Sequence, residues 1–151
     1  MDIINTALLS FGSSGRVFHG PLLEAHPGFR LSGCWERSAK TLTQFYPSAT
    51  SYESLEQVLS DPGIDLVIVN TPTATHYEYT RKVLEHGKHV VTEKAFTSTA
   101  EEAATLQELA QERRCKLAVF HNRRWDSDFQ SVRRVLQEGR LGDVVDGILF
   151  L

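Results

Sequence analysis

A pair of glycines near the N-terminus has a spacing that could serve phosphate binding. The segment Ser10-x-Gly12-x-x-Gly15 follows a short apolar run and precedes an amphipathic stretch. Between a strand and a helix, Gly12 would let the backbone approach a pyrophosphate, Gly15 would let the helix pack closely on the strand, and the helix N-terminus would supply N–H donors. Because Ser10 replaces the first glycine of the usual G-x-G-x-x-G pattern, a plain tight turn is the alternative. The predicted phosphate-binding residues are Ser10, Gly12, Ser13, Ser14 and Gly15.

An acidic residue follows the second apolar run at the distance that a dinucleotide site requires. Glu36 lies roughly 20 residues beyond the glycines, where a carboxylate can accept hydrogen bonds from the ribose hydroxyls of adenosine. The next two residues, Arg37 and Ser38, could instead hold a 2′-phosphate. Glu36 favours NAD, whereas Arg37 keeps NADP open. A charged pair at a strand end, with no ligand, is the alternative for both residues.

Three polar segments follow other apolar runs. They are residues 70–72, 93–95 and 121–124. In an open parallel sheet, ligands bind beyond the carboxyl ends of the strands. We therefore expect the three segments to converge on one cleft with the glycine loop.

The elements that would position these residues alternate along the chain. Short apolar runs, most of them continuous rather than alternating, predict strands at residues 7–11, 30–35, 66–70, 90–93 and 117–120. Amphipathic segments lie between them, and this alternation is typical of βαβ units that form a parallel sheet with both faces covered. The predicted fold class is therefore α/β, a doubly wound parallel sheet of the Rossmann type over residues 1–120.

Capping signals support the helices between these strands. Three pairs fit the capping box, namely Ser54 with Gln57, Thr75 with Glu78, and Ser98 with Glu101. In this motif two side chains satisfy backbone N–H groups that the first helical turn leaves open. Each pair predicts a helix start.

Residues 121–151 follow the last strand of a complete parallel sheet, and we expect them to begin a second domain. Helical spacing of apolar residues predicts a helix over residues 127–138, and residues 144–151 have the composition of a strand. We interpret them as a bridge helix and the first strand of a second α/β domain, most of which the truncated chain lacks. An unpaired strand with Val144, Ile148 and Leu149 would invite edge pairing, which predicts a homo-oligomer or aggregates.

Bulk composition excludes several classes of protein. The chain has 151 residues, of which 41% are hydrophobic and 23% charged, the average composition of a globular domain. A net charge of −3 gives no electrostatic reason to bind nucleic acid or an anionic membrane. No apolar run approaches the ~20 residues of a membrane span, and the histidines lack metal-site spacing. Only two cysteines occur, so we expect a reducing, cytoplasmic location.

Four segments together resemble the Gfo/Idh/MocA family of oxidoreductases. They are residues 11–19, 69–72, 87–94 and 121–129, and the resemblance extends over the whole chain. The family combines an N-terminal Rossmann domain with a C-terminal α/β domain. The resemblance implies an NAD(P)-dependent oxidoreductase that acts on a small-molecule substrate, namely a sugar, polyol or related hydroxy or carbonyl compound. This chain would be its cofactor-binding half.

The resemblance also implies roles for particular residues. Lys94 would be catalytic, because a lysine desolvated in a closed cleft can exchange protons near neutral pH and so assist the proton movement that accompanies hydride transfer at a carbinol carbon. An ordinary surface ion pair between Glu93 and Lys94 is the alternative, and Ala95 replaces the family's usual proline. His76 would lie on the cofactor side, unless it only caps its helix. The further cofactor-binding residues are Asn70, Thr71, Pro72, His76, Glu93, Lys94, Asn122 and Arg123.

Two other functions are compatible with these patterns. A non-catalytic nucleotide-binding fragment or sensor module would bind the cofactor without turnover. A different Rossmann-type user of an adenosine ligand, such as a methyltransferase, would leave the Glu93-Lys94 strand end without a role.

Overall fold

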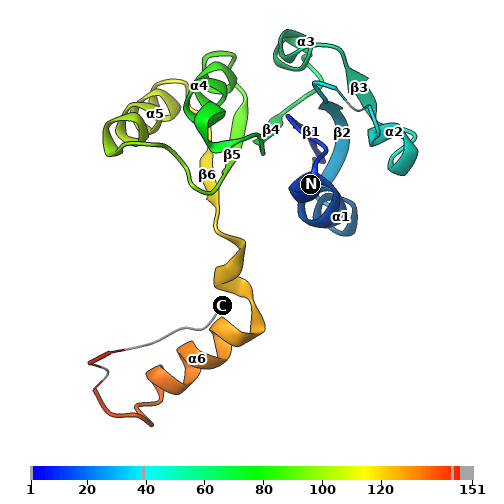
Figure 1. The fold of residues 1–151 in the computed structure, drawn as a ribbon. Helices are drawn as coiled ribbons and strands as arrows, with labels where there is room; N and C mark the ends of the chain where they lie inside the picture. The colour runs from blue at the N-terminus through cyan, green and yellow to red at the C-terminus, as the bar shows by residue number, and fades with distance from the viewer. Residues whose placement is uncertain (1, 39, 144, 147–151) are drawn as a thin grey trace. The chain divides into compact units, whose positions relative to one another are not determined.

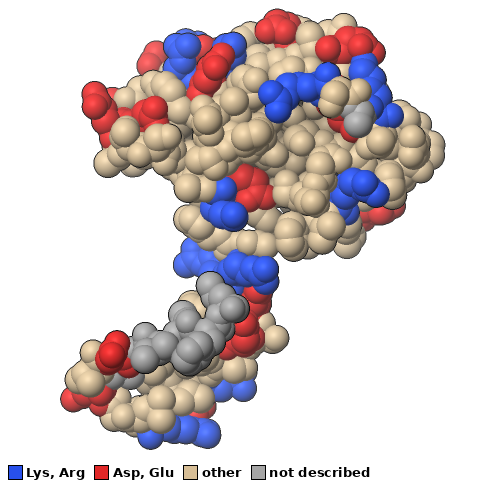
Figure 2. Space-filling view, in the orientation of Figure 1, with Lys and Arg blue, Asp and Glu red and all other residues tan. Residues whose placement is uncertain are grey.

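The computed structural model describes residues 2–38, 40–143 and 145–146. The chain divides into two compact units, Met1–Phe120 and His121–Leu151. In the first unit, side chains of both charges are mixed over the face that Figure 2 displays. Among the described residues, no helix reaches the length and hydropathy that a membrane span requires.

The first unit is built on one parallel sheet (Figure 1). Its strands are β1 Ile4–Leu8, β2 Phe29–Trp35, β3 Thr50–Tyr52, β4 Leu66–Val69, β5 His89–Glu93 and β6 Leu117–Phe120. They lie in the order β3-β2-β1-β4-β5-β6, and every pair of neighbours is parallel. Strand order therefore reverses between β1 and β4, which creates the crevice where such sheets bind ligands. The predicted Rossmann fold is confirmed.

Helices cover both faces of this sheet. They are η1 Gly15–His19, α1 Gly20–Ala25, α2 Leu42–Phe45, α3 Leu55–Ser60, η2 Thr73–Thr75, α4 His76–Glu85 and α5 Ala100–Glu112. One buried cluster joins Ala7 of β1 to Val83 and Leu106 on α4 and α5. The other joins Leu8, the next residue along β1, to Leu23 of α1. Successive side chains of a strand point to opposite faces, so a strand buried on both sides is continuously apolar.

The strand predictions differ from the structure by more than one residue in two places. β1 starts at Ile4 and ends at Leu8, whereas we predicted residues 7–11. Thr6 is fully buried although it is polar, and the chain leaves the sheet after Leu8 to form the glycine loop. The strand β3 was missed because its three residues are too few to show a period.

The capping predictions are correct at one helix, displaced at another and wrong at the third. Ser54 caps α3 by accepting from the Gln57 amide at 3.2 Å. The capping box of α5 joins Thr99 and Glu102, one residue beyond the predicted pair. Thr75 forms no cap, because its hydroxyl donates to the Pro72 carbonyl at 2.7 Å.

The second unit contains η3 Asn122–Trp125 and α6 Ser127–Gln137, which ends one residue before the predicted boundary. Gly139 follows the helix with a φ of +66°, a conformation that favours glycine at a helix end. Within the predicted strand over residues 144–151, Val144 and residues 147–151 lie outside the described residues. The oligomer prediction that depends on Val144, Ile148 and Leu149 therefore stays a prediction.

Candidate functional site

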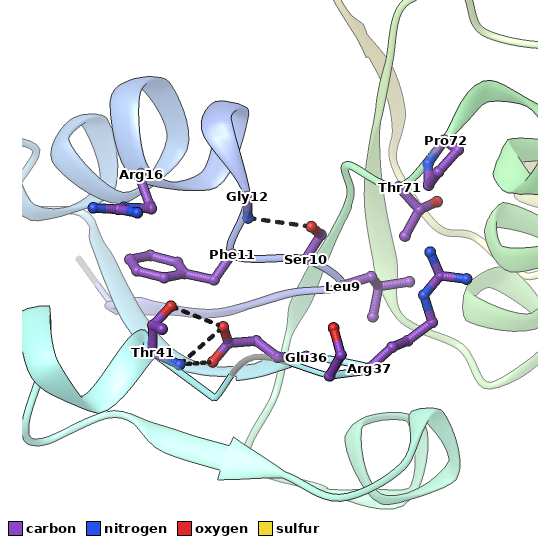
Figure 3. Close-up of a pocket in the computed structure, with 11 residues that line it drawn as sticks. Leu9, Ser10, Phe11, Gly12, Arg16, Glu36, Arg37, Thr41, Thr71 and Pro72 are labelled. Carbon is purple, nitrogen blue, oxygen red and sulfur yellow. Dashed lines mark hydrogen bonds between the residues drawn. The ribbon is translucent and has the colours of Figure 1, made fainter.

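A cavity of about 350 Å³ lies at the carboxyl ends of β1, β2 and β4 (Figure 3). Its lining residues are Leu9, Ser10, Phe11, Gly12, Arg16, Glu36, Arg37, Ser38, Thr41, Thr71 and Pro72. The loops after three different strands thus meet here, at the point where strand order reverses. Six of the residues predicted to bind a cofactor are among them: Ser10, Gly12, Glu36, Arg37, Thr71 and Pro72.

The glycine loop leads directly into a helix. Ser13 and Ser14 are already helical, and the Arg16 amide donates to the Gly12 carbonyl at 3.0 Å. The amides of the first helical turn, at Ser13, Ser14 and Gly15, have no partner within the helix. The helix continues as the π-helical segment η1, a distortion that is frequent at functional sites.

The two glycines have different structural roles. A Cβ atom added at Gly12 would meet only the Ser10 hydroxyl, at 3.5 Å, so this residue faces open space. A Cβ atom at Gly15 would lie 2.7 Å from the Ser10 carbonyl oxygen, which is closer than real contacts permit. Gly12 therefore leaves room for a ligand, whereas Gly15 permits the close approach of loop and helix.

Asn70 ties this loop to the end of β4. Its buried amide donates to the Ser10 carbonyl at 2.8 Å and to the Ser14 hydroxyl at 3.3 Å. The Oδ1 atom of Asn70 is buried and has no hydrogen-bond partner among the described residues. A buried acceptor without a partner calls for an explanation such as a bound water or ligand. Together with the open space at Gly12, this atom makes the loop a good fit for a dinucleotide.

Glu36 is engaged by its own chain. Its buried carboxylate accepts from the Thr41 amide at 3.0 and 3.1 Å, from the Thr41 hydroxyl at 3.1 Å and from the Leu42 amide at 2.9 Å. Thr41 is the N-cap residue of α2, so the carboxylate satisfies amides at the start of that helix. Figure 3 shows the Glu36 carboxylate directed toward Thr41.

Two arginines flank the cavity. The Arg16 guanidinium lies 4.6 Å from the centroid of the Phe45 ring, a cation–π contact. In Figure 3 the Arg37 side chain extends the other way, toward Thr71 and Pro72. Arg16, Phe11 and Thr41 were not predicted. The position of Arg16 in the first turn after the glycines could have indicated it.

His76 joins two loops and does not line the cavity. The side chain is buried, with Nδ1 2.7 Å from the Ala95 carbonyl and Nε2 2.8 Å from the Thr71 carbonyl. These carbonyls belong to the loops after β5 and β4. A neutral imidazole carries one N–H, so it can donate to only one of them at a time. The geometry gives His76 a role in holding the strand-end loops together.

The side chain of Lys94 is exposed, and its amide donates to Glu93 at 3.3 Å. The Lys94–Ala95 peptide bond is cis. A catalytic Lys94 would have to be desolvated, and the residues that the structure describes do not bury its side chain. Asn122 and Arg123 lie in the second unit, where Arg123 pairs with Asp126 at 2.7 Å. The predicted roles of Lys94, Asn122 and Arg123 remain predictions.

A buried pair connects the glycine-loop helix to the end of β5. His19, the last residue of η1, lies 2.9 Å from the Glu93 carboxylate through Nε2. Its ring centroid lies 4.4 Å from that of Phe120 on β6. Burial lowers the pKa of His19 below its ordinary value of 6.5, although the hydrogen bond and the charge of Glu93 oppose this shift. Through its hydrogen bond, His19 holds Glu93, the residue before Lys94, against the glycine-loop helix.

The lowered pKa of His19 predicts a pH dependence of stability. As the pH falls below 6.5, the unfolded chain binds a proton at this histidine while the folded chain does not, so the free energy of unfolding decreases. Replacing His19 by glutamine keeps a hydrogen-bond donor and removes the titration. Urea unfolding at about pH 8 and about pH 5.5 should show a larger loss of stability in the wild type than in His19→Gln. Equal losses would contradict the assignment.

Comparison with known proteins supports the interpretation of the first unit as a dinucleotide-binding domain. Residues 4–121 match the Gfo/Idh/MocA family, an oxidoreductase family with an NAD-binding Rossmann fold. The chain is 42% identical over 144 residues to scyllo-inositol 2-dehydrogenase (NADP(+)) IolW of Bacillus subtilis, a match that covers 95% of the chain and 40% of that protein. It is 46% identical over 152 residues to the uncharacterized oxidoreductase C115.03 of Schizosaccharomyces pombe, covering 97% of the chain and 41% of the relative.

A solved structure shares the fold. The crystal structure of a putative oxidoreductase from Bacteroides fragilis superposes with a TM-score of 0.88 at 46% identity, covering 95% of the chain and 43% of that protein. The chain spans about 40% of the length of the curated relatives named above.

Proposed function

The chain belongs to the Gfo/Idh/MocA oxidoreductase family, and from this premise we propose that it is the cofactor-binding half of an NAD(P)-dependent oxidoreductase. The observation that carries the proposal is the cavity at the strand-order reversal, with open space at Gly12, together with the Oδ1 atom of Asn70 at the end of β4, which has no partner among the described residues. The first-turn amides of the glycine-loop helix would hold the pyrophosphate. The nicotinamide, when bound, supplies the hydride acceptor or donor.

The proposed substrate is a sugar, polyol or related hydroxy or carbonyl compound. The relative that is 42% identical is a scyllo-inositol 2-dehydrogenase, which favours a cyclic polyol as the substrate. Lys94, at the carboxyl end of β5, would hold or move the proton of the reacting hydroxyl. We propose that residues 121–151 form the bridge to a second, substrate-binding domain and that Asn122 and Arg123 are cofactor-binding residues.

A second candidate is a nucleotide-binding module without catalysis. The observation that favours it is the exposure of the Lys94 side chain, which no described residue encloses in a closed cleft. This candidate shares the cofactor cavity with the first and differs from it only in turnover.

The experiment that tests these proposals is a calorimetric titration of the chain with NADPH and with NADH, followed by an assay of scyllo-inositol oxidation with NADP⁺ and NAD⁺. Saturable binding of at least one nucleotide is expected. Binding with turnover supports the oxidoreductase over the module, whereas binding without turnover is the result that both the cofactor-binding half and the module predict. Absence of binding by both nucleotides would exclude both candidates.

A further inference from the structure

We propose that the cavity selects NADP over NAD, because Glu36 stabilises its own loop and leaves Arg37 and Ser38 to receive a 2′-phosphate. This inference rests on the proposed function, in which the cavity binds a nicotinamide dinucleotide. It goes beyond the family assignment, which leaves the choice of nucleotide open.

The first step concerns the acceptor capacity of Glu36. In a Rossmann domain that prefers NAD, a carboxylate at the end of the second strand accepts hydrogen bonds from the ribose hydroxyls. Here the carboxylate already receives four hydrogen bonds from the Thr41 amide, the Thr41 hydroxyl and the Leu42 amide. Because the Thr41 amide is shared between both oxygens, these bonds come from three donors, and a carboxylate offers about four lone-pair sites, so at most one site is left for a ribose hydroxyl.

The second step is the cost of redirecting this carboxylate toward a ribose. Leu42 is fully buried, and its amide donates to Glu36 at 2.9 Å. Turning the carboxylate away would leave a buried N–H group without a partner, and such a group carries a full desolvation penalty. The same three donors compensate the negative charge of Glu36, so its repulsion of a nearby phosphate is reduced.

The third step concerns the cations that the site offers. Arg16 and Arg37 line the cavity together with one carboxylate, that of Glu36, so the charged lining has an excess of positive charge. Lys40, in the same loop, forms an ion pair with Glu53 and does not line the cavity. Arg37 and Ser38 are exposed, and Arg37 forms no ion pair with any described residue.

The fourth step is the match between these groups and the extra phosphate. A guanidinium donates two parallel hydrogen bonds to a phosphate, and a neighbouring hydroxyl can donate a third. The 2′-hydroxyl of NAD would be offered these donors, while Glu36 has at most one acceptor site left for it. Arg37 and Ser38, which follow Glu36, are therefore placed to recognise an anion beside the ribose.

The test is a set of calorimetric titrations with NADPH, NADH, adenosine 2′,5′-bisphosphate and adenosine 5′-monophosphate. The wild-type chain is expected to bind NADPH at least about tenfold more tightly than NADH, with the same order for the two adenosine fragments. Arg37→Ala should weaken NADPH binding by about ten- to a hundredfold and leave NADH within about threefold. Lys40→Ala, which removes a cation from the same loop outside the cavity, should change neither affinity by more than about twofold.

The outcomes distinguish a failure of the proposed cofactor binding from a failure of the proposed NADP preference. If neither dinucleotide binds, the proposed function itself fails. If NADH binds as tightly as NADPH or more tightly, the function stands and the inference is overturned. The inference also fails if Arg37→Ala weakens both nucleotides equally, or if Lys40→Ala removes the preference as completely as Arg37→Ala does.

Discussion

Replacing Gly12 by valine is expected to weaken the binding of the preferred nicotinamide cofactor by at least about a hundredfold. A Cβ atom at this position projects into space bounded only by the Ser10 hydroxyl at 3.5 Å, so the isopropyl group would occupy the volume that a pyrophosphate needs. It would also hold the ligand away from the first-turn amides that should bind the phosphates. Calorimetric titration of the variant measures this loss.

Two further glycine variants separate the loss of ligand space from the loss of fold. Gly12→Ala adds a single methyl group and should give an intermediate affinity, with a thermal midpoint close to that of the wild type. Gly15→Ala should instead lower the thermal midpoint, because its Cβ atom would lie 2.7 Å from the Ser10 carbonyl oxygen. Binding by Gly12→Val within about threefold of the wild type would show that the loop does not hold the phosphates.

The sheet could be predicted from sequence because both of its faces are buried. The central strand β4, Leu66–Val69, gives a continuous apolar run, and the amphipathic segments alternate regularly with the apolar runs along the chain. The edge strand β3, Thr50–Tyr52, has three residues and no such run. The first half of β1 lacks an apolar run, because Thr6 is a polar residue that the sheet buries completely. Apolar periodicity detects neither feature.

The candidate site could be predicted in position and only partly in detail. The glycine loop and the strand ends determine where the cavity lies, and six predicted residues line it. The direction of a side chain depends on which donors the fold brings near it. For Glu36 these donors are the amides of Thr41 and Leu42, five and six residues further along the chain. The partners of His76 are two backbone carbonyls from different loops, and only the folded sheet brings these loops together.

Replacing Glu36 by alanine is expected to lower the free energy of unfolding by about 2–4 kcal/mol. The variant loses four hydrogen bonds to a carboxylate and leaves the buried Leu42 amide without its acceptor. If Glu36 served only to bind ribose, its removal from the ligand-free chain would leave stability nearly unchanged. Urea unfolding of the chain without nucleotide therefore distinguishes a loop-stabilising carboxylate from a ligand-binding one.

Glu53→Ala is the matched control for this measurement. Glu53 pairs with Lys40 in the neighbouring sequence, but both side chains are substantially exposed, so the loss of this pair should cost less than about 1 kcal/mol. Glu36→Gln should fall between the wild type and Glu36→Ala, because one amide oxygen can still accept from Thr41 or Leu42. A Glu36→Ala variant as stable as Glu53→Ala would refute the internal role of Glu36. The carboxylate would then be free to bind the ribose hydroxyls, and the cavity would be expected to prefer NAD.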